Sequence, residues 1–265
     1  AYLRKPLVMG ILNVTPDSFS DGGSFLETRA AYQHAQLMIA QGVDIIDIGG
    51  ESTKPGADEI SCAEELARII PVIECIRAES DICISVDTCK AEVMQAAIAA
   101  GASLINDVRA LSGDGALAIA SQLNVPVCLM HMQGTPQTMQ ENPSYKDVVA
   151  DVHTYLADRM AQCVAQGIAK ERLIVDVGIG FGGHRGERHH RVRRPVGVEL
   201  GELAAEVGIV LGERVRLFAP GAHAGVVDQE ALGVIVPVEL GGQVLQPEGQ
   251  RVRRGQLPPH EGWRR

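Results

Sequence analysis

Six short apolar runs recur through the first two thirds of the chain, and this repetition constrains the fold more than any other feature. The runs are Val8–Asn13, Ile45–Gly49, Cys83–Asp87, Leu104–Asp107, Val127–Met130 and Leu173–Asp176. Their apolar residues are largely continuous instead of alternating with polar ones, which is typical of strands buried on both faces. We therefore predict six buried strands.

Helical patterns separate most of these strands. Apolar residues three and four positions apart share one helix face in three segments: Tyr32, Ala35, Met38 and Ile39; Val93, Met94, Ala97 and Ile98; and Val149, Val152, Leu156, Met160 and Cys163. We expect these helices to end at Gly42, Gly101 and Gly167, because glycine adopts the left-handed cap conformation at little cost. Strands that alternate with helices predict an α/β fold with a parallel sheet.

The length of the chain distinguishes between two folds that have a parallel sheet. Six β/α units fit either a barrel or a doubly wound sheet, but 89 residues follow Asp176, which is room for two more units. Eight units of this kind typically need about 250 residues, so the length favours a TIM (β/α)8 barrel. The catalytic face of that barrel lies at the carboxyl ends of the strands, where polar residues collect in this sequence.

The composition changes near residue 184. The last 82 residues contain no Lys, Ser, Thr, Asn, Met, Cys or Tyr, whereas turns and helix caps normally use Ser, Thr and Asn. We therefore divide the chain into a barrel region, 1–183, and an anomalous C-terminal segment, 184–265, that stands in place of the last two units. A segment read out of frame or joined from elsewhere would have such a composition. Within it, 207–211 and 232–240 are candidate strands, the second weakened by Pro237.

Charge and residue usage exclude several functions. The net charge of −9 and the nine aromatic residues argue against a nucleic-acid partner. No apolar run approaches the roughly 18 residues that a transmembrane helix needs, so we expect no membrane partner. The six cysteines form no CxxC pair, which favours reduced, buried thiols in a cytoplasmic protein.

The strand ends carry the candidate chemistry. Asp87, Asn106 and Asp176 end three strands, and their carboxylate and amide groups suit a flat heterocycle rich in N–H donors, such as a pterin or a purine. The loop 13–23 is rich in glycine and small hydroxyl groups, which suits a lid that closes on an anion. The loop 49–56 adds hydroxyl groups and one cation beside the same mouth. His131 has no HxH or HExxH partner, so we interpret it as a core or supporting residue instead of a metal ligand.

A glycine pattern after the sixth strand suggests a second kind of site. Gly178, Gly180 and Gly183 spell GxGxxG, and Glu199 follows about 20 residues later, as in a dinucleotide-binding fingerprint. That fingerprint needs a helix next, and the arginine-rich stretch 184–194 is a poor helix start that ends at Pro195. The dinucleotide site is therefore the weaker hypothesis.

Six motifs lie at the ends of the predicted strands: MGILNVTPDSFSDGG (9–23), DIGGESTKPGA (47–57), ISVDT (84–88), INDVRAL (105–111), CLMHMQGTPQTMQ (128–140) and DVGIGFG (176–182). Together, in this order and spacing, they resemble the dihydropteroate synthase family. The resemblance covers residues 8 to 183 and implies a TIM barrel. It implies a transferase of folate biosynthesis that joins p-aminobenzoate to (7,8-dihydropterin-6-yl)methyl diphosphate and releases diphosphate.

The resemblance also implies roles for individual residues. The metal site would be Asn13, binding the Mg²⁺ that neutralises the leaving diphosphate. The implied substrate-binding residues are Thr53, Asp87, Asn106 and Asp176 at the pterin, Phe19 and Pro55 at the p-aminobenzoate and sulfonamide pocket, and Lys54 and Phe181 in the matching motifs. By the same resemblance we expect a homodimer.

The match to the family stops near residue 183. Val177 replaces the usual proline, and Lys54 replaces the usual arginine, which keeps the charge but loses the bidentate fork. The family's Ser-Arg-Lys on strand seven and Arg-x-His on strand eight are absent, and no lysine follows Lys170. An alternative function is therefore a catalytically impaired or non-catalytic pterin-binding barrel. We further expect a loosely packed tail that leaves the edges of strands one and six unpaired.

Overall fold

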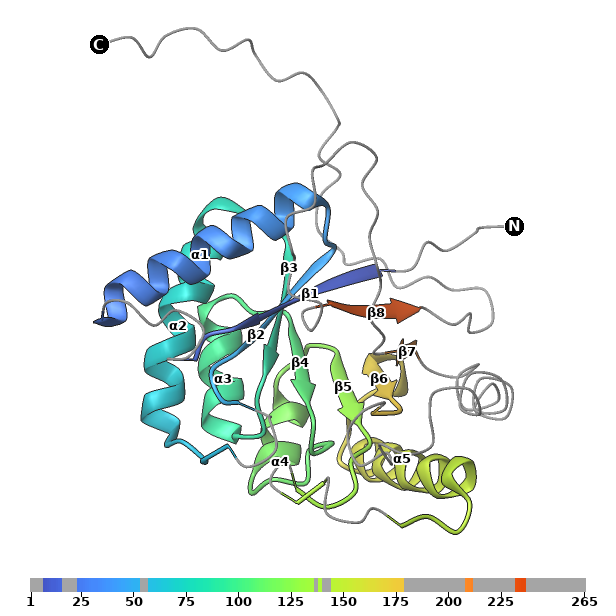
Figure 1. Ribbon diagram of the computed structural model, residues 1–265. Coiled ribbons are helices and arrows are strands. Elements are labelled where there is room, and N and C mark those ends of the chain that lie inside the picture. Colours follow the sequence, from blue (N-terminus) through green and yellow to red (C-terminus); the bar gives the residue numbers. More distant parts are fainter. Residues whose placement is uncertain are drawn as a thin grey trace, which may run out of the picture.

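A computed structural model of the chain describes residues 7–15, 23–52, 57–135, 138–139, 144–178, 208–211 and 232–236. In these segments eight strands form one closed barrel in chain order. The strands are β1 (Leu7–Asn13), β2 (Ile45–Gly49), β3 (Cys83–Asp87), β4 (Leu104–Asp107), β5 (Val127–Met130), β6 (Leu173–Asp176), β7 (Gly208–Leu211) and β8 (Leu232–Val236). The six predicted strands are confirmed, and only β1 differs, by starting one residue earlier (Figure 1).

The C-terminal segment contributes two strands to the barrel, which corrects one expectation. β7 pairs parallel with β6, and β8 pairs with both β7 and β1, so neither β1 nor β6 has a free edge. Both strands fall inside the candidate segments, and β8 ends immediately before Pro237, which cannot donate a ladder hydrogen bond. β8 runs antiparallel to both neighbours, so the closure departs from the all-parallel barrel that was predicted.

Five helices in the described part of the chain cover the outside of the barrel. They are α1 (Gly23–Gln41), α2 (Cys62–Glu79), α3 (Ala91–Ala100), α4 (Ala116–Gln122) and α5 (Val148–Ala165), and a 3-10 turn, Lys170–Arg172, leads into β6. The three predicted helices are confirmed, and Gly42, Gly101 and Gly167 follow their ends at positive φ. The sequence patterns did not single out α2 and α4.

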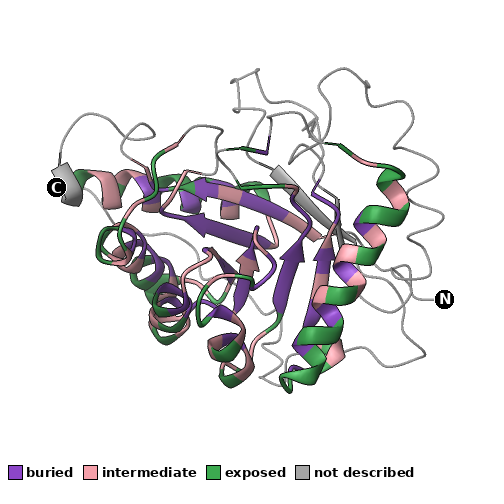
Figure 2. Ribbon diagram, turned by 90° about the horizontal axis from the view of Figure 1, so that it is seen from below, coloured by how far each residue is buried: buried purple, intermediate pink, exposed green. Residues whose placement is uncertain are grey.

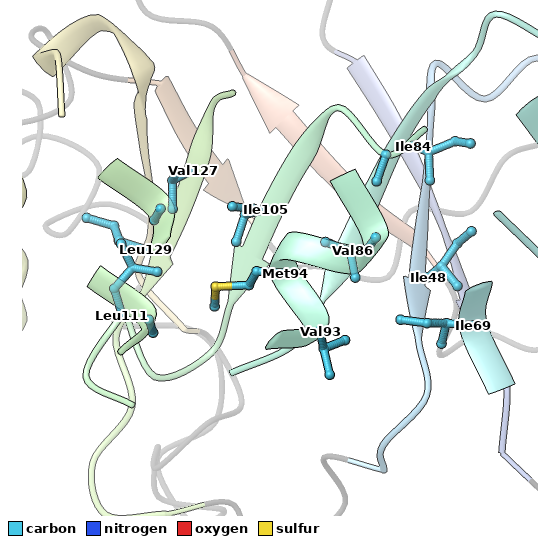
Figure 3. Close-up of a cluster of buried hydrophobic side chains, with 14 of the residues drawn as sticks. Ile48, Ile69, Ile84, Val86, Val93, Met94, Ile105, Leu111, Val127 and Leu129 are labelled. Atoms are coloured by element: carbon cyan, nitrogen blue, oxygen red, sulfur yellow. The ribbon is translucent and has the colours of Figure 1, made fainter. Parts of the chain in front are cut away.

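The main core lies between the strands and these helices. Outward-facing residues of the strands pack against the inner faces of α2 and α3, and Figure 3 shows this layer around Ile48, Val86 and Met94. The buried residues form a continuous band inside the helices, whose outer faces are exposed (Figure 2). A second, smaller cluster of Met9, Ile45, Leu104 and Cys128 fills the barrel interior. Packing on both strand faces explains why the runs do not alternate.

The composition led us to expect reduced, buried thiols. All six cysteines are free, but only Cys128 and Cys163 are buried and Cys75 is exposed, so the expected burial is confirmed only for these two. No helix in the described part of the chain is long and apolar enough to cross a membrane. The boundary near residue 183 remains a prediction.

Candidate active site

The strand register brings the predicted polar residues to one end of the barrel. Asn13 is paired with Gly49, Gly49 with Asp87, and Asp87 with Asn106, so these four positions lie at one level across β1 to β4. Asp176 ends β6, and it acts electrostatically on Cys128, as does Asp87. The structure therefore gathers Asn13, Asp87, Asn106 and Asp176 around one mouth.

Gly49 leaves space between two of these side chains. A methyl group placed on Gly49 would lie 3.5 Å from Asn13 Oδ1 and 3.6 Å from Asp87 Oδ2. Both oxygens therefore approach the same point beside the end of β2. Amide and carboxylate oxygens are hard ligands of the kind that Mg²⁺ prefers. The donor set at this point fits that ion, although the described residues hold no cluster of three His, Cys, Asp or Glu that could bind a metal.

Asp47 lies deeper in the barrel and supports Asn106. Its Oδ2 accepts a hydrogen bond of 3.1 Å from Asn106 Nδ2, and its side chain is almost fully buried. Burial raises the pKa of Asp47, while Ser85 and Asn106 lower it. The sequence analysis did not include Asp47 among the site residues. The hydrogen bond joins residues 59 positions apart, so no local pattern could have revealed it.

The mouth is electrostatically negative. Burial raises the pKa of Asp87 well above its usual value, and Asp47 and Asp107 raise it further. Burial also raises the pKa of Asp176 to about 6, partly offset by the 2.8 Å hydrogen bond from the Gly178 N–H. Carboxylates in such surroundings gain most from a ligand that supplies N–H donors or positive charge.

Asp107 has a structural role. Its two carboxylate oxygens accept hydrogen bonds from Arg109 N at 2.7 Å and Leu111 N at 2.9 Å. These bonds hold a tight turn in which Ala110 and Leu111 have φ values of 50° and 58°. Asp107 therefore caps the turn after β4.

A lysine that sequence reasoning missed lies beside the mouth. Lys90 follows β3, and its Nζ lies 2.5 Å from Glu51 Oε2 and 2.6 Å from Glu65 Oε2. Burial lowers the pKa of Lys90, but its hydrogen bonds to Glu51 and Glu65 outweigh burial and raise it. Glu65 comes from α2 and is fully buried, so the lysine neutralises charge inside the protein. Glu51 Oε1 also accepts a 3.3 Å hydrogen bond from Ile60 N.

His131 is a supporting residue, in agreement with its interpretation from the sequence. It is 6% exposed and packs edge-on against Tyr155, with ring centroids 5.0 Å apart. Burial lowers the pKa of His131, which favours the neutral ring. Its backbone N–H donates to Asp176 O at 2.8 Å and so holds the end of β6 against β5.

Several predicted residues lie outside the described part of the chain. Thr53, Lys54, Pro55, Phe19 and Phe181 belong to this group. So do Gly180 and Gly183 of the candidate dinucleotide fingerprint and the stretch 184–194, which would have to begin its helix. Their roles remain predictions.

Replacing Gly178 by Ala should destabilise the end of β6. Gly178 has a φ of +67°, and a Cβ atom there would lie 1.9 Å from His131 O, so the backbone would have to move. Overpacking of this kind costs about 1–3 kcal/mol of unfolding free energy. Urea denaturation of Gly178→Ala measures it, and Gly167→Ala is the matched control because it also has positive φ but no atom within 4 Å. Equal losses in the two variants would show that contact with His131 is unimportant.

Fold and site together define an α/β barrel whose mouth is lined by half-buried carboxylates and an amide, a class suited to nitrogen-rich rings. The chain belongs to the pterin binding enzyme family, whose model matches residues 9–209. It is 56% identical over 180 residues to the dihydropteroate synthase of Escherichia coli strain K12. That match covers 68% of this chain and 64% of the E. coli protein, which is less than two thirds of its length.

Solved structures give the same family. The dihydropteroate synthase of Yersinia pestis, in complex with a sulfonamide drug, has 47% identity and a TM-score of 0.70, covering 79% of this chain and 74% of that one. The Xanthomonas albilineans enzyme with 4-aminobenzoic acid has 51% identity and a TM-score of 0.63, covering 68% of this chain and 63% of that one. These similarities extend to the fold of the barrel, so the resemblance found from the motifs is confirmed.

Proposed function

We propose that this chain catalyses the dihydropteroate synthase reaction, joining p-aminobenzoate to (7,8-dihydropterin-6-yl)methyl diphosphate with release of diphosphate. The observation that carries the proposal is the convergence of Asp87, Asn106 and Asp176 at the carboxyl end of one barrel. Membership of the pterin binding enzyme family supports it. So does the binding of 4-aminobenzoic acid by the Xanthomonas albilineans relative.

The reaction depends on placement of the pterin ring and on stabilisation of developing charge more than on a strong base. The bond between the pterin methylene carbon and the bridging oxygen breaks, and the amine nitrogen of p-aminobenzoate forms the new bond and loses a proton. Asp87 and Asp176 would accept N–H groups of the ring, and their negative charge would stabilise positive charge that develops on the pterin. Asn106 would fix the ring in the same plane.

Asn13 would hold Mg²⁺, which neutralises the diphosphate as it leaves. Its Oδ1 and Asp87 Oδ2 approach one point beside Gly49, which supports this assignment. We further propose that Thr53 and Lys54 contact the pterin and the diphosphate, and that Phe19, Pro55 and Phe181 line the p-aminobenzoate pocket. Sulfonamides would compete there. A cytoplasmic location and a homodimer complete the proposal.

A second function is favoured by a specific observation. No lysine follows Lys170, and the strand that closes the barrel, β8, runs antiparallel to its neighbours. The family's cationic residues on strands seven and eight are therefore missing from the sequence. A barrel with an intact ring site that lacks these two groups of cations would bind a pterin without converting it to product.

Replacing Asp87 by Asn tests the pterin site. The variant exchanges a charge-assisted acceptor for an amide, which must present one donor to the ring, so pterin binding should weaken by about 1.5–3 kcal/mol. Calorimetric titration of a pterin analogue into wild type and Asp87→Asn measures the difference. Asp114→Asn, on the exposed surface beyond β4, is a matched control. Equal affinity of the wild type and the Asp87 variant would mean that Asp87 is structural.

A further inference from the structure

A polar layer lies inside the barrel, one step below the mouth. Asp47 on β2 is in register with Ser85 on β3, and Asn106 follows on β4. The hydrogen bond from Asn106 to Asp47 joins β2 and β4, which are not neighbours in the sheet, and so crosses β3 on the inside of the barrel. Ser85 is small and fully buried, which leaves room for this crossing.

This bond decides which end of the Asn106 amide a ligand meets. An amide has a donating NH2 group and an accepting oxygen, whereas an ionised carboxylate only accepts. Asp47 therefore takes the Nδ2 end of Asn106, and Oδ1 is left as the end that can serve a ligand. Turning the amide over would place Oδ1 against the carboxylate and lose the charge-assisted bond.

The burial of Asp47 at this position lowers the stability of the fold. Only 3% of its surface is exposed, and among the described residues neither its Oδ1 nor the neighbouring Ser85 Oγ has a partner with hydrogen-bond geometry, although the nearby hydroxyl still lowers the pKa of the carboxyl. Buried, incompletely satisfied carboxylates reduce stability relative to apolar residues. The cost is explained if the carboxylate serves the site and not the fold.

We propose that Asp47 is a positioning residue that sets the Asn106 amide so that its carbonyl faces the bound ring. The mouth then offers acceptors at three places, Asp87, Asn106 Oδ1 and Asp176, and selects rings whose edge presents several N–H donors. The inference rests on the proposed pterin site and adds the reason for its preference. Asp47 itself need not touch the ligand.

The Asp47→Asn variant tests the proposal with little change in volume. An asparagine at this position can meet either end of the Asn106 amide, so the orientation is no longer enforced and the bond is no longer charge-assisted. We expect pterin to bind about fivefold more weakly, measured by calorimetry on the full chain. Asp44→Asn is the matched control, because Asp44 lies before the other end of β2 and accepts Val8 N at 2.9 Å, away from the mouth.

A double-mutant cycle separates positioning from general packing. In an Asn106→Ala background the Asp47 substitution should change pterin affinity less than twofold, since it acts through the amide that is now absent. The same fivefold loss in both backgrounds, or wild-type affinity in Asp47→Asn, overturns the proposal. If the wild-type chain binds no pterin, the proposed function itself fails, so the two failures are distinguishable. Thermal unfolding of each variant reports whether it is folded.

Discussion

Replacing Lys90 by Met should lower the free energy of unfolding by about 3–5 kcal/mol, the usual cost of leaving a buried charge without its partner. Lys90 Nζ lies 2.6 Å from Glu65 Oε2, and the Glu65 side chain has no exposed surface. Methionine keeps the length of the lysine stem but removes the charge and all three donors. Urea denaturation followed by circular dichroism measures the loss.

Two further variants make the result specific to the ion pair. Lys146→Met removes an exposed lysine before α5 and should change the unfolding free energy by less than about 0.5 kcal/mol. Adding Glu65→Leu to Lys90→Met should recover most of the lost stability, because the buried carboxylate is removed together with its partner. If the double variant were as unstable as Lys90→Met alone, the loss would come from packing of the lysine stem and not from charge.

Some residues of the site could be predicted from the sequence, whereas the residues of this ion pair could not. The strands were predictable because packing on both faces requires apolar residues in runs, and the residue at the end of each run is then located at the mouth. Asp87, Asn106 and Asp176 were found in this way. Lys90 lies 25 residues from Glu65 and 39 residues from Glu51 along the chain, and only the fold brings the three side chains together.

The helices and the closing strand show a second limit. α2 begins at the N-cap Ser61, whose side chain accepts from Glu64 N, but it carries Pro71 in its interior, against local helix propensity. Burial of Ile69, Val72 and Ile73 against the barrel stabilises the helix despite that residue. The direction of β8 was not predictable either, because an apolar run has the same pattern whether it pairs parallel or antiparallel.

The chain as it stands should turn over far more slowly than the Escherichia coli relative. Removing one preorganised group that stabilises developing charge typically costs about 10²–10³ in rate, or about 2.7–4 kcal/mol. The departing diphosphate carries several negative charges, and the sequence has no lysine after Lys170 and no Arg-x-His within β8 or beyond it. We therefore expect kcat to fall at least about 100-fold below that of the relative, in parallel assays of diphosphate release.

A pair of chimaeras assigns the deficit to the C-terminal segment. Residues 1–176 of this chain contain Asn13, Asp87, Asn106 and Asp176, and joining them to the corresponding last third of the E. coli protein should raise kcat by most of the missing factor. The reciprocal chimaera, with the E. coli barrel and residues 177–265 of this chain, should be as slow as the chain itself while still binding pterin. Turnover equal to that of the relative in the unaltered chain would contradict this expectation. It would mean that the arginine-rich stretch 185–194 supplies the missing cations, and Ala substitution of those arginines would then abolish the activity.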